Sequence, residues 1–389
     1  MQLLVAFDKF KDSMTAKTAC ERAAEGLREV LGPDARIVTA PLTDGGEGFC
    51  PILTEAAGGW VEQHPVSGPL GETIHAPLGW VESQRLPEAA RRRFPGVAGR
   101  IAIVEMASAA GLEQVPPERR HPRHTTTRGV GELIRVAAAK DAAAVLIGVG
   151  GSATSDLGLG ALEALGLNFE GAEGILPAKW AQLGTISREP FPAPPLFIAC
   201  DVDNPLCGPN GAAHRYGPQK GLAADEIEAF DAEARRVAGL LLESLDRPAD
   251  LMERPGSGAA GGIGFGLGAA FDAAFLPGFP LVADWLDLEA ETARADLVLS
   301  GEGKIDRSSL SGKGPCALAR MAAKAGRPCR LFAGRVEPGA REAIEKEIAR
   351  ATVQSIAPPG LPLAEALAAG PENLRRAVAE NLRQSPPAP

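Results

Sequence analysis

Short apolar segments alternate with helical patterns at both ends of the chain, and this alternation restricts the fold more than any other feature. Near the N-terminus, residues 2–7 and 36–40 predict buried strands, and residues 16–30 between them place apolar side chains at helical spacing. The order strand, helix, strand is typical of an α/β domain with a parallel sheet. The C-terminal third repeats this order, with strands expected at 296–300, 329–334 and 352–356 and helices at 313–325, 338–349 and 363–383.

The central part of the chain has a different pattern. Residues 60–66, 73–81 and 101–106 predict strands with no helix between them, which indicates hairpins or a mixed sheet. At 389 residues the chain is long enough for two or three domains. We therefore expect a parallel-sheet α/β domain built from residues 1–60 and 285–383, a second, mixed α/β domain inserted at 61–284, and a disordered tail at 384–389.

The composition argues against several classes of function. The chain has 40 basic and 49 acidic side chains and a net charge of −9, so we expect no binding to nucleic acid or to a membrane surface. The six cysteines lack the spacing of a zinc site, and no apolar run is long enough for a membrane helix. Because the N-terminus also lacks the features of a signal peptide, we expect a cytoplasmic location. The oligomeric state stays open.

Many of the 46 glycines lie beside acidic, hydroxyl or lysine residues just after predicted strands. In an open parallel sheet, ligands bind at the carboxyl edge of the strands, where such segments lie. One cluster alone could be an ordinary turn, but five on the same edge indicate a polar cleft lined by glycines, carboxylates and lysines. The five clusters are residues 8–13, 44–48, 150–156, 201–204 and 301–306.

This mixture of residues suits phosphoryl transfer. Backbone N–H groups in glycine turns bind phosphate, lysines neutralise its charge, and aspartates supply oxygen ligands for Mg²⁺. Phosphoryl transfer depends on these functions more than on covalent catalysis. An alternative stays open, because residues 148–153 (GVGGSA) resemble a dinucleotide-binding turn, with Glu170 about 20 residues further on. That pattern would suit an NAD(P)-dependent oxidoreductase that acts on a small hydroxy acid.

Seven segments also carry a family resemblance. They are AFDKFKDSMTA at 6–16, PLTDGGEG at 41–48, TTTRGVGELI at 125–134, GVGGSATSDLGLGALEALG at 148–166, ACDVDNPLCGPNGAAHRYGPQKG at 199–221, GSGAAGGIGFGLGA at 256–269 and LSGEGKIDRSSLSGKGP at 299–315. In this order they resemble the bacterial type I glycerate kinases. The resemblance implies ATP-dependent phosphorylation of D-glycerate with Mg²⁺, and bacterial members of this type are associated with 2-phosphoglycerate as product. It also implies a flavodoxin-like domain and a second α/β domain with a mixed sheet, and we expect the cleft between the two.

The chain departs from the family pattern at three places. The family often has glycine where Asp12 stands, and commonly Asn-Asp-Gly-Gly where this chain has residues 155–158. Leu157 therefore occupies a position at which the resemblance implies glycine, whereas Asp156 is retained. The usual Thr-Ser-Tyr-Gly is Thr-Thr-Arg-Gly at residues 126–129.

Chemistry suggests catalytic roles for four side chains. Asp201 follows a predicted strand, and we expect it to ligate Mg²⁺ or to act as base for the glycerate hydroxyl; the alternative is an Asx turn. Asp44 lies in a glycine turn that suits a ligand, but with Glu47 it also has the spacing of a capping box. Lys11 or its neighbour Lys9 is expected to bind the glycerate carboxylate or a phosphate, with a solvated loop charge as the alternative. Lys313 is expected to neutralise the charge of the transferred group, and its alternative is a plain helix-terminal lysine.

The other predicted site residues bind ligands. The substrate-binding residues are expected to be Lys9, Ser13, Glu47 and Asp306. The expected nucleotide-binding residues are Gly150, Gly151 and Ser152, which would form a phosphate cradle, together with Asp156 and Glu302. Helix capping is the alternative role for Ser152. Lys220 is a further candidate, and the glycine-rich stretch at 256–268 suits either a site or close packing.

Overall fold

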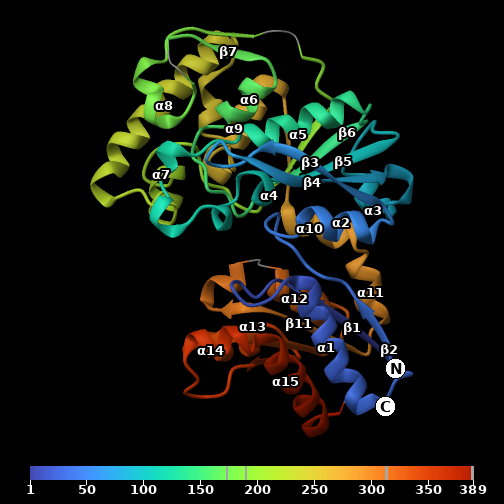
Figure 1. Cartoon of the computed structure of the whole chain (residues 1–389). Helices are drawn as coiled ribbons and strands as arrows, with labels where there is room; N and C mark the ends of the chain where they lie inside the picture. The colour runs from blue at the N-terminus through green and yellow to red at the C-terminus, as the bar shows by residue number, and fades with distance from the viewer. Residues whose placement is uncertain (172–173, 189–190, 312–313, 387–389) are drawn as a thin grey trace. The chain divides into compact units, whose positions relative to one another are not determined.

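The structure is a computed structural model that describes residues 1–171, 174–188, 191–311 and 314–386. The chain divides into two compact units (Figure 1): unit 1 is Met1–Asp44 with Val282–Pro389, and unit 2 is Gly45–Leu281. The first boundary differs from the expected division after residue 60, because helix α2 (Phe49–Ala56) packs against strands of unit 2. The second boundary lies within helix α10 (Gly278–Trp285).

Unit 1 contains a five-stranded parallel sheet with the strand order β13-β12-β11-β1-β2. Leu3 of β1 lies beside Leu297 of β11 on one side and Ile37 of β2 on the other. The order reverses between β1 and β11, which is the flavodoxin-like arrangement, so the predicted fold class of this domain is confirmed. Its elements are β1 (Gln2–Phe7), α1 (Ala16–Leu31), β2 (Arg36–Thr39), α11 (Leu288–Arg294), β11 (Leu297–Ile305), α12 (Gly314–Lys324), β12 (Cys329–Val336), α13 (Ala340–Glu347), β13 (Ala351–Ser355), α14 (Leu363–Ala368) and α15 (Gly370–Gln384).

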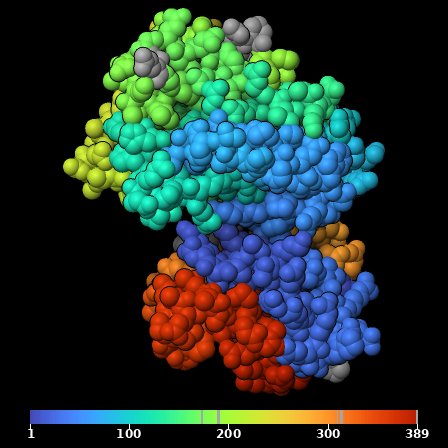
Figure 2. Space-filling model, viewed as in Figure 1, coloured from blue at the N-terminus to red at the C-terminus, as the bar shows by residue number. Residues whose placement is uncertain are grey.

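Segments from both ends of the chain share the core of unit 1. Helix α1 begins after Thr15, whose Oγ1 accepts a hydrogen bond from the N–H of Thr18 at 3.1 Å. The buried face of α1, which includes Leu27, packs against Val378 of α15 and the apolar side chains of β1. Figure 2 shows the C-terminal residues, in red, directly against N-terminal residues, in blue, on the surface of this unit. Unit 1 therefore requires both ends of the chain.

Unit 2 contains a six-stranded mixed sheet with the order β10-β9-β6-β5-β4-β3. The neighbours β3, β4 and β5 run antiparallel, and β5, β6, β9 and β10 run parallel, which confirms the predicted mixed sheet. The other elements of the unit are α3 (Glu88–Arg91), α4 (Met106–Ala110), α5 (Arg128–Ala139), α6 (Leu159–Ala164), α7 (Ala212–Tyr216), α8 (Ile227–Ser244), α9 (Ile263–Phe271) and a small pair, β7 (Leu167–Phe169) with β8 (Ile186–Arg188). The strands of the large sheet are β3 (Trp60–Ser67), β4 (Thr73–Glu82), β5 (Arg100–Glu105), β6 (Ala144–Gly148), β9 (Leu196–Ala199) and β10 (Ala274–Leu276).

The five glycine clusters lie on the edges of two sheets, so the prediction of one common edge is wrong. Clusters 8–13 and 301–306 follow or end β1 and β11 of unit 1, whereas 150–156 and 201–204 follow β6 and β9 of unit 2. Cluster 44–48 contains the boundary between the units. The error arose because each sheet has its own carboxyl edge, and sequence spacing does not say which strands share a sheet.

The last predicted helix, 363–383, is two helices in the structure. Helix α14 ends at Ala368, and α15 begins at Gly370 with a proline in its first turn, a position that favours a helix start. Helix α15 continues to Gln384, into the tail expected to be disordered, and residues 387–389 of that tail lie outside the described residues. Within the described chain, no helix has the length and apolarity needed to span a membrane.

Candidate active site

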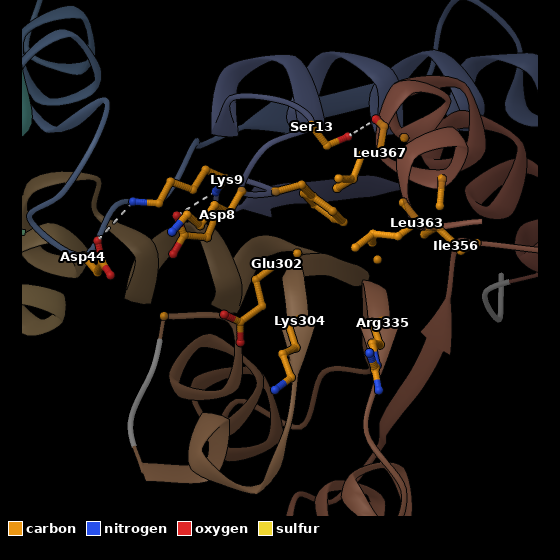
Figure 3. A pocket seen from close by; sticks show the side chains of 18 residues that line it. Asp8, Lys9, Ser13, Asp44, Glu302, Lys304, Arg335, Ile356, Leu363 and Leu367 are labelled. Atoms are coloured by element: carbon orange, nitrogen blue, oxygen red, sulfur yellow. Dashed lines mark hydrogen bonds and ion pairs between the residues drawn. The ribbon is translucent and has the colours of Figure 1, made fainter. Parts of the chain in front are cut away.

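Unit 1 has a cavity of about 430 Å³ at the carboxyl edge of its sheet (Figure 3). It lies where β1 and β11 end, the point at which the strand order reverses and where sheets of this kind bind ligands. Five of the residues predicted from sequence line this cavity: Lys9, Lys11, Ser13, Asp44 and Glu302. The structure also adds Asp8, Lys304 and Arg335, which the sequence hypotheses did not include.

The polar side chains of the cavity contact one another and the surrounding loops. Nζ of Lys9 lies 4.0 Å from Oδ1 of Asp44, and Oε1 of Glu302 accepts a hydrogen bond from Ser309 at 3.0 Å. The hydroxyl of Ser13 donates to the carbonyl oxygen of Leu367 at 2.7 Å, which ties the loop after β1 to α14. This bond gives Ser13 a structural role in addition to its position in the cavity wall.

Two other predicted residues, Asp306 and Lys313, are not among the described residues that line the cavity. The Oδ2 of Asp306 lies 3.4 Å from Nζ of Lys304, and Lys304 does line the cavity. Lys313 lies outside the described residues, so its predicted role stays a prediction.

Asp8 is a carboxyl group of the cavity whose pKa is strongly raised. Its side chain is buried, and its Oδ1 accepts the N–H of Lys9 at 2.7 Å. Burial, and then the negative charge of Asp44, raise the pKa of Asp8 to about 8, although Lys9 opposes the shift. A carboxyl group with this pKa can hold or release a proton near neutral pH, which is a property common at active sites. Sequence patterns gave no sign of it, because Asp8 differs from any other strand-end aspartate only in its surroundings.

We expect Asp8→Asn to stabilise the protein, and to do so more at pH 8 than at pH 5. A raised pKa means that ionised Asp8 destabilises the folded state, so wild-type stability falls as pH rises from about 4 to about 8. Asparagine keeps the shape and the acceptor oxygen but never ionises. The gain at pH 8 should be on the order of 1–3 kcal/mol. Calorimetric melting across this pH range measures it, with the exposed neighbour Asp12→Asn as control; an equal gain at every pH would contradict the assignment.

The loop after β6 packs tightly against another loop of unit 2. The N–H of Gly150 donates to the carbonyl oxygen of Gly45 at 2.9 Å, and a Cβ at Gly150 would lie 2.7 Å from the backbone of Gly46. A Cβ at Gly151, where φ is +69°, would lie 2.3 Å from Oε1 of Glu47. Close loop packing explains both glycines. The binding of phosphate by Gly150 stays a prediction, and in this structure its N–H is bonded within the protein.

Asp156 is buried and bonded entirely within unit 2. Its carboxylate accepts four hydrogen bonds, from the N–H and the hydroxyl of Thr127 at 2.8 and 2.9 Å and from the N–H groups of Gly158 and Gly160 at 3.2 Å. These bonds join the starts of α5 and α6. These contacts give Asp156 a structural role, and its binding of the nucleotide stays a prediction. The same burial raises the pKa of Asp156, and the hydrogen bonds oppose the shift.

Lys220 supports the loop after β6, residues 150–156, from inside unit 2. The side chain is buried, and Nζ donates to Oγ of Ser152 at 2.9 Å and to the carbonyl oxygen of Thr154. Burial lowers the pKa of Lys220 to about 7, although the charge of Asp156 acts in the opposite direction. Lys220 thus positions the loop that contains Gly151 and Ser152 and does not face a ligand. Ser152 has no capping role, because α6 begins at Leu159.

Asp201 lies at the carboxyl edge of the unit 2 sheet. Ala199 of β9 pairs with Gly148 of β6. Asp201 comes two residues after Ala199 and Gly150 comes two residues after Gly148, so both lie just beyond the ends of neighbouring strands. Asp201 is exposed, and its Oδ2 accepts the N–H of Phe279 in the first turn of α10 at 2.7 Å. The carboxylate therefore caps α10, which replaces the Asx turn proposed as its structural alternative.

Asp44 and Glu47 do not occupy the N-cap and N3 positions of helix α2. Helix α2 begins at Phe49, its N-cap is Gly48, and no side chain caps it at that position. Instead, buried Glu105, the last residue of β5, accepts the N–H of Cys50 at 2.9 Å. Burial raises the pKa of Glu105, and hydrogen bonds from Ser108, Cys50 and Gly48 limit the rise. Sequence spacing missed this contact because the two residues are far apart in the chain.

The glycine-rich stretch at 256–268 is a packing surface, which was one of its two predicted roles. A Cβ at Gly261 would lie 2.1 Å from the carbonyl oxygen of Thr154, and one at Gly266 would lie 2.3 Å from that of Leu157. The stretch thus packs against the backbone of residues 154–157. Leu157 itself is buried with φ of 57°, so the position at which the resemblance implies glycine has the backbone that glycine favours.

The carboxylates of the site suit Mg²⁺ only as partial ligands. Among the described residues, no group of three or more histidine, cysteine, aspartate or glutamate side chains is placed to hold a metal ion. Mg²⁺ that accompanies a nucleotide needs only one or two carboxylates, because phosphate oxygens and water complete its shell. The exposed carboxylate of Asp201 fits that requirement.

Comparisons with known proteins give one consistent result. The sequence model described as the glycerate kinase family matches residues 3–385. The glycerate kinase of Bacillus subtilis is 36% identical over 97% of this chain and 95% of its own length. The glycerate 2-kinase of Escherichia coli is 37% identical over 86% of this chain and 85% of its own length. A crystal structure of a Salmonella typhimurium LT2 protein, described as a candidate glycerate kinase 2, aligns with a TM-score of 0.76 at 36% identity and covers 99% of this chain and 98% of its own.

Proposed function

The chain belongs to the glycerate kinase family, and we propose on that basis that it transfers the γ-phosphate of ATP to D-glycerate. The observation that carries this proposal is the 37% identity, over 86% of this chain and 85% of the other, to a relative named glycerate 2-kinase. That name supports the 2-hydroxyl as acceptor, with 2-phosphoglycerate and ADP as products. The cavity at the strand-order reversal of unit 1, with its lysines and carboxylates, supplies the polar surface that phosphoryl transfer needs.

We propose that Asp201 is the base of the reaction. The bond between the γ-phosphorus and the bridging oxygen of ATP breaks, a bond to the glycerate oxygen forms, and the hydroxyl proton must leave. A carboxylate can accept that proton. Asp201 is also the proposed Mg²⁺ ligand, and Mg²⁺ would neutralise phosphate charge when bound.

The charged residues of unit 1 are proposed to bind and orient the reactants. Lys9 and Lys11 would neutralise phosphate or carboxylate groups, and Asp44 would orient a hydroxyl or a metal-bound water. Glu302, Ser13 and Asp306 would complete the polar surface. In unit 2, Glu47, Gly151 and Ser152 stay as proposed binding residues. Lys313 stays a proposed residue for charge neutralisation.

The alternative function, an NAD(P)-dependent oxidoreductase, has no support from the relatives, which are named as kinases. The loop that suggested it is also explained by packing, because Gly150 and Gly151 lie against residues 45–47. A cytoplasmic location and the absence of nucleic-acid binding stay predictions from composition.

The function is tested by mixing the purified chain with ATP, D-glycerate and MgCl₂ and measuring ADP. We expect ADP release that requires both D-glycerate and the metal, with L-glycerate and lactate as control acceptors. The same sample should give no change in nicotinamide absorbance with NAD⁺ or NADP⁺ in place of ATP. Absence of glycerate-dependent ADP release across a range of Mg²⁺ concentrations would contradict the proposal.

A further inference from the structure

The cavity of unit 1 has a charged end and an apolar end. Figure 3 shows Asp8, Lys9 and Asp44 on one side and Ile356, Leu363 and Leu367 on the other. The apolar side chains come from α14 and from the residue after β13. The ligand that fills this cavity should therefore be charged at one end and apolar at the other.

At the apolar end, Ile356 belongs to the core of unit 1, whereas α14 leaves apolar surface exposed. Helix α14 has the sequence LAEALA but none of its residues is buried, and Leu363 is 73% exposed. A large exposed aliphatic side chain in the wall of a cavity indicates a ligand with an apolar surface. D-Glycerate has an oxygen on each of its three carbons, so it offers no such surface. An adenine ring does.

The charged end suits a polyphosphate. Lys9, Lys11 and Lys304 bring three cations to the cavity, which lies at the strand-order reversal where flavodoxin-like sheets bind nucleotides. Lysine ammonium groups bind phosphate as point charges. Carboxylates at the same end are oxygen ligands of the kind that Mg²⁺ takes beside a phosphate chain.

We propose that this cavity is the nucleotide site, with adenine against Ile356, Leu363 and Leu367 and the phosphates toward Lys9 and Lys11. The proposal rests on the proposed kinase function and assigns one of its two substrates to a place. It moves Lys9 from the glycerate to the nucleotide, and it gives α14 a function that no sequence motif indicated. This arrangement does not require the glycine loop at 150–152 to contact the adenine ring.

The test uses the full chain and measures binding of ADP, in excess MgCl₂, by calorimetry. Leu363→Ser should weaken ADP binding about 10-fold, because it removes the apolar surface beneath the base. Ala364→Ser is the matched control, since Ala364 is exposed on the same helix and does not line the cavity. In turnover assays, Leu363→Ser should raise KM for ATP by a similar factor and leave KM for D-glycerate unchanged.

A second variant tests the orientation of the nucleotide. Lys11→Met should weaken ADP binding about 10-fold but leave inhibition by adenosine unchanged, because adenosine has no phosphate. Leu363→Ser should weaken both ligands. Wild-type ADP affinity in Leu363→Ser, or an increase in KM for D-glycerate instead of ATP, would overturn the proposal while glycerate kinase activity persists. Conversely, ADP binding that depends on Leu363, without phosphorylation of D-glycerate, would support this site and refute the proposed function.

Discussion

Asp201→Asn is expected to lower kcat for glycerate phosphorylation by at least about 100-fold, since a general base typically contributes a factor of 10² to 10⁴. Asparagine is close in size to aspartate and keeps an oxygen that can accept the N–H of Phe279, so α10 stays capped. The substitution therefore removes the negative charge and leaves the structural contact. Steady-state kinetics with ATP and D-glycerate measure the effect.

Two further variants separate catalysis from structure at Asp201. Asp203→Asn is the matched control, because Asp203 is exposed, lies two residues further along the same segment, and should keep near-normal kcat. Asp201→Ala also removes the cap of α10, so it should lose about 0.5–2 kcal/mol of stability in addition to activity. A kcat close to wild type in Asp201→Asn, with the melting temperature unchanged, would remove Asp201 from the mechanism.

Asp156→Ala is expected to destabilise unit 2 by about 3–5 kcal/mol, the range found when one partner of a buried charged network is removed. The substitution would leave four buried donors, on Thr127, Gly158 and Gly160, without their acceptor. Urea denaturation followed by tryptophan fluorescence reports mainly on this unit, because Trp60, Trp80 and Trp180 lie in it.

Asp156→Asn is the conservative partner of this variant. One amide oxygen can replace Oδ2, which accepts three of the four bonds, so the loss should be less than half of that in Asp156→Ala. If Asp156 instead bound the nucleotide, both variants would raise KM for ATP at unchanged stability. That outcome would restore the role first inferred from sequence and contradict the structural one.

Most of the fold follows from local sequence patterns. The alternation at both ends predicted β1, α1, β2, β12 and β13 within about two residues, because buried parallel strands and amphipathic helices have strong periodicity. The start of β11 was predicted equally well, but the strand continues five residues beyond its predicted end, to Ile305. The strands at 60–67, 73–82 and 100–105 were recognised as a separate, mixed sheet for the same reason. The break between α14 and α15 was missed, since the apolar spacing continues across Gly370.

The site was less predictable, because its residues acquire their properties from distant parts of the chain. Asp8 is perturbed by burial and by Asp44, and Glu105 caps α2 across the fold. Asp156 and Lys220 have the residue types of a nucleotide site, yet both are buried and make their hydrogen bonds within unit 2. Sequence reasoning identified the charged segments correctly but had no measure of which side chains face inward.

The position of the phosphate on the product tests the central claim most directly. The full chain is incubated with ATP, MgCl₂ and D-glycerate, and the product is passed to enolase without phosphoglycerate mutase. Formation of phosphoenolpyruvate in proportion to the ADP released is the predicted result, because enolase acts directly on 2-phosphoglycerate. ADP release with no phosphoenolpyruvate until the mutase is added would show phosphorylation at the 3-hydroxyl and contradict the proposed reaction.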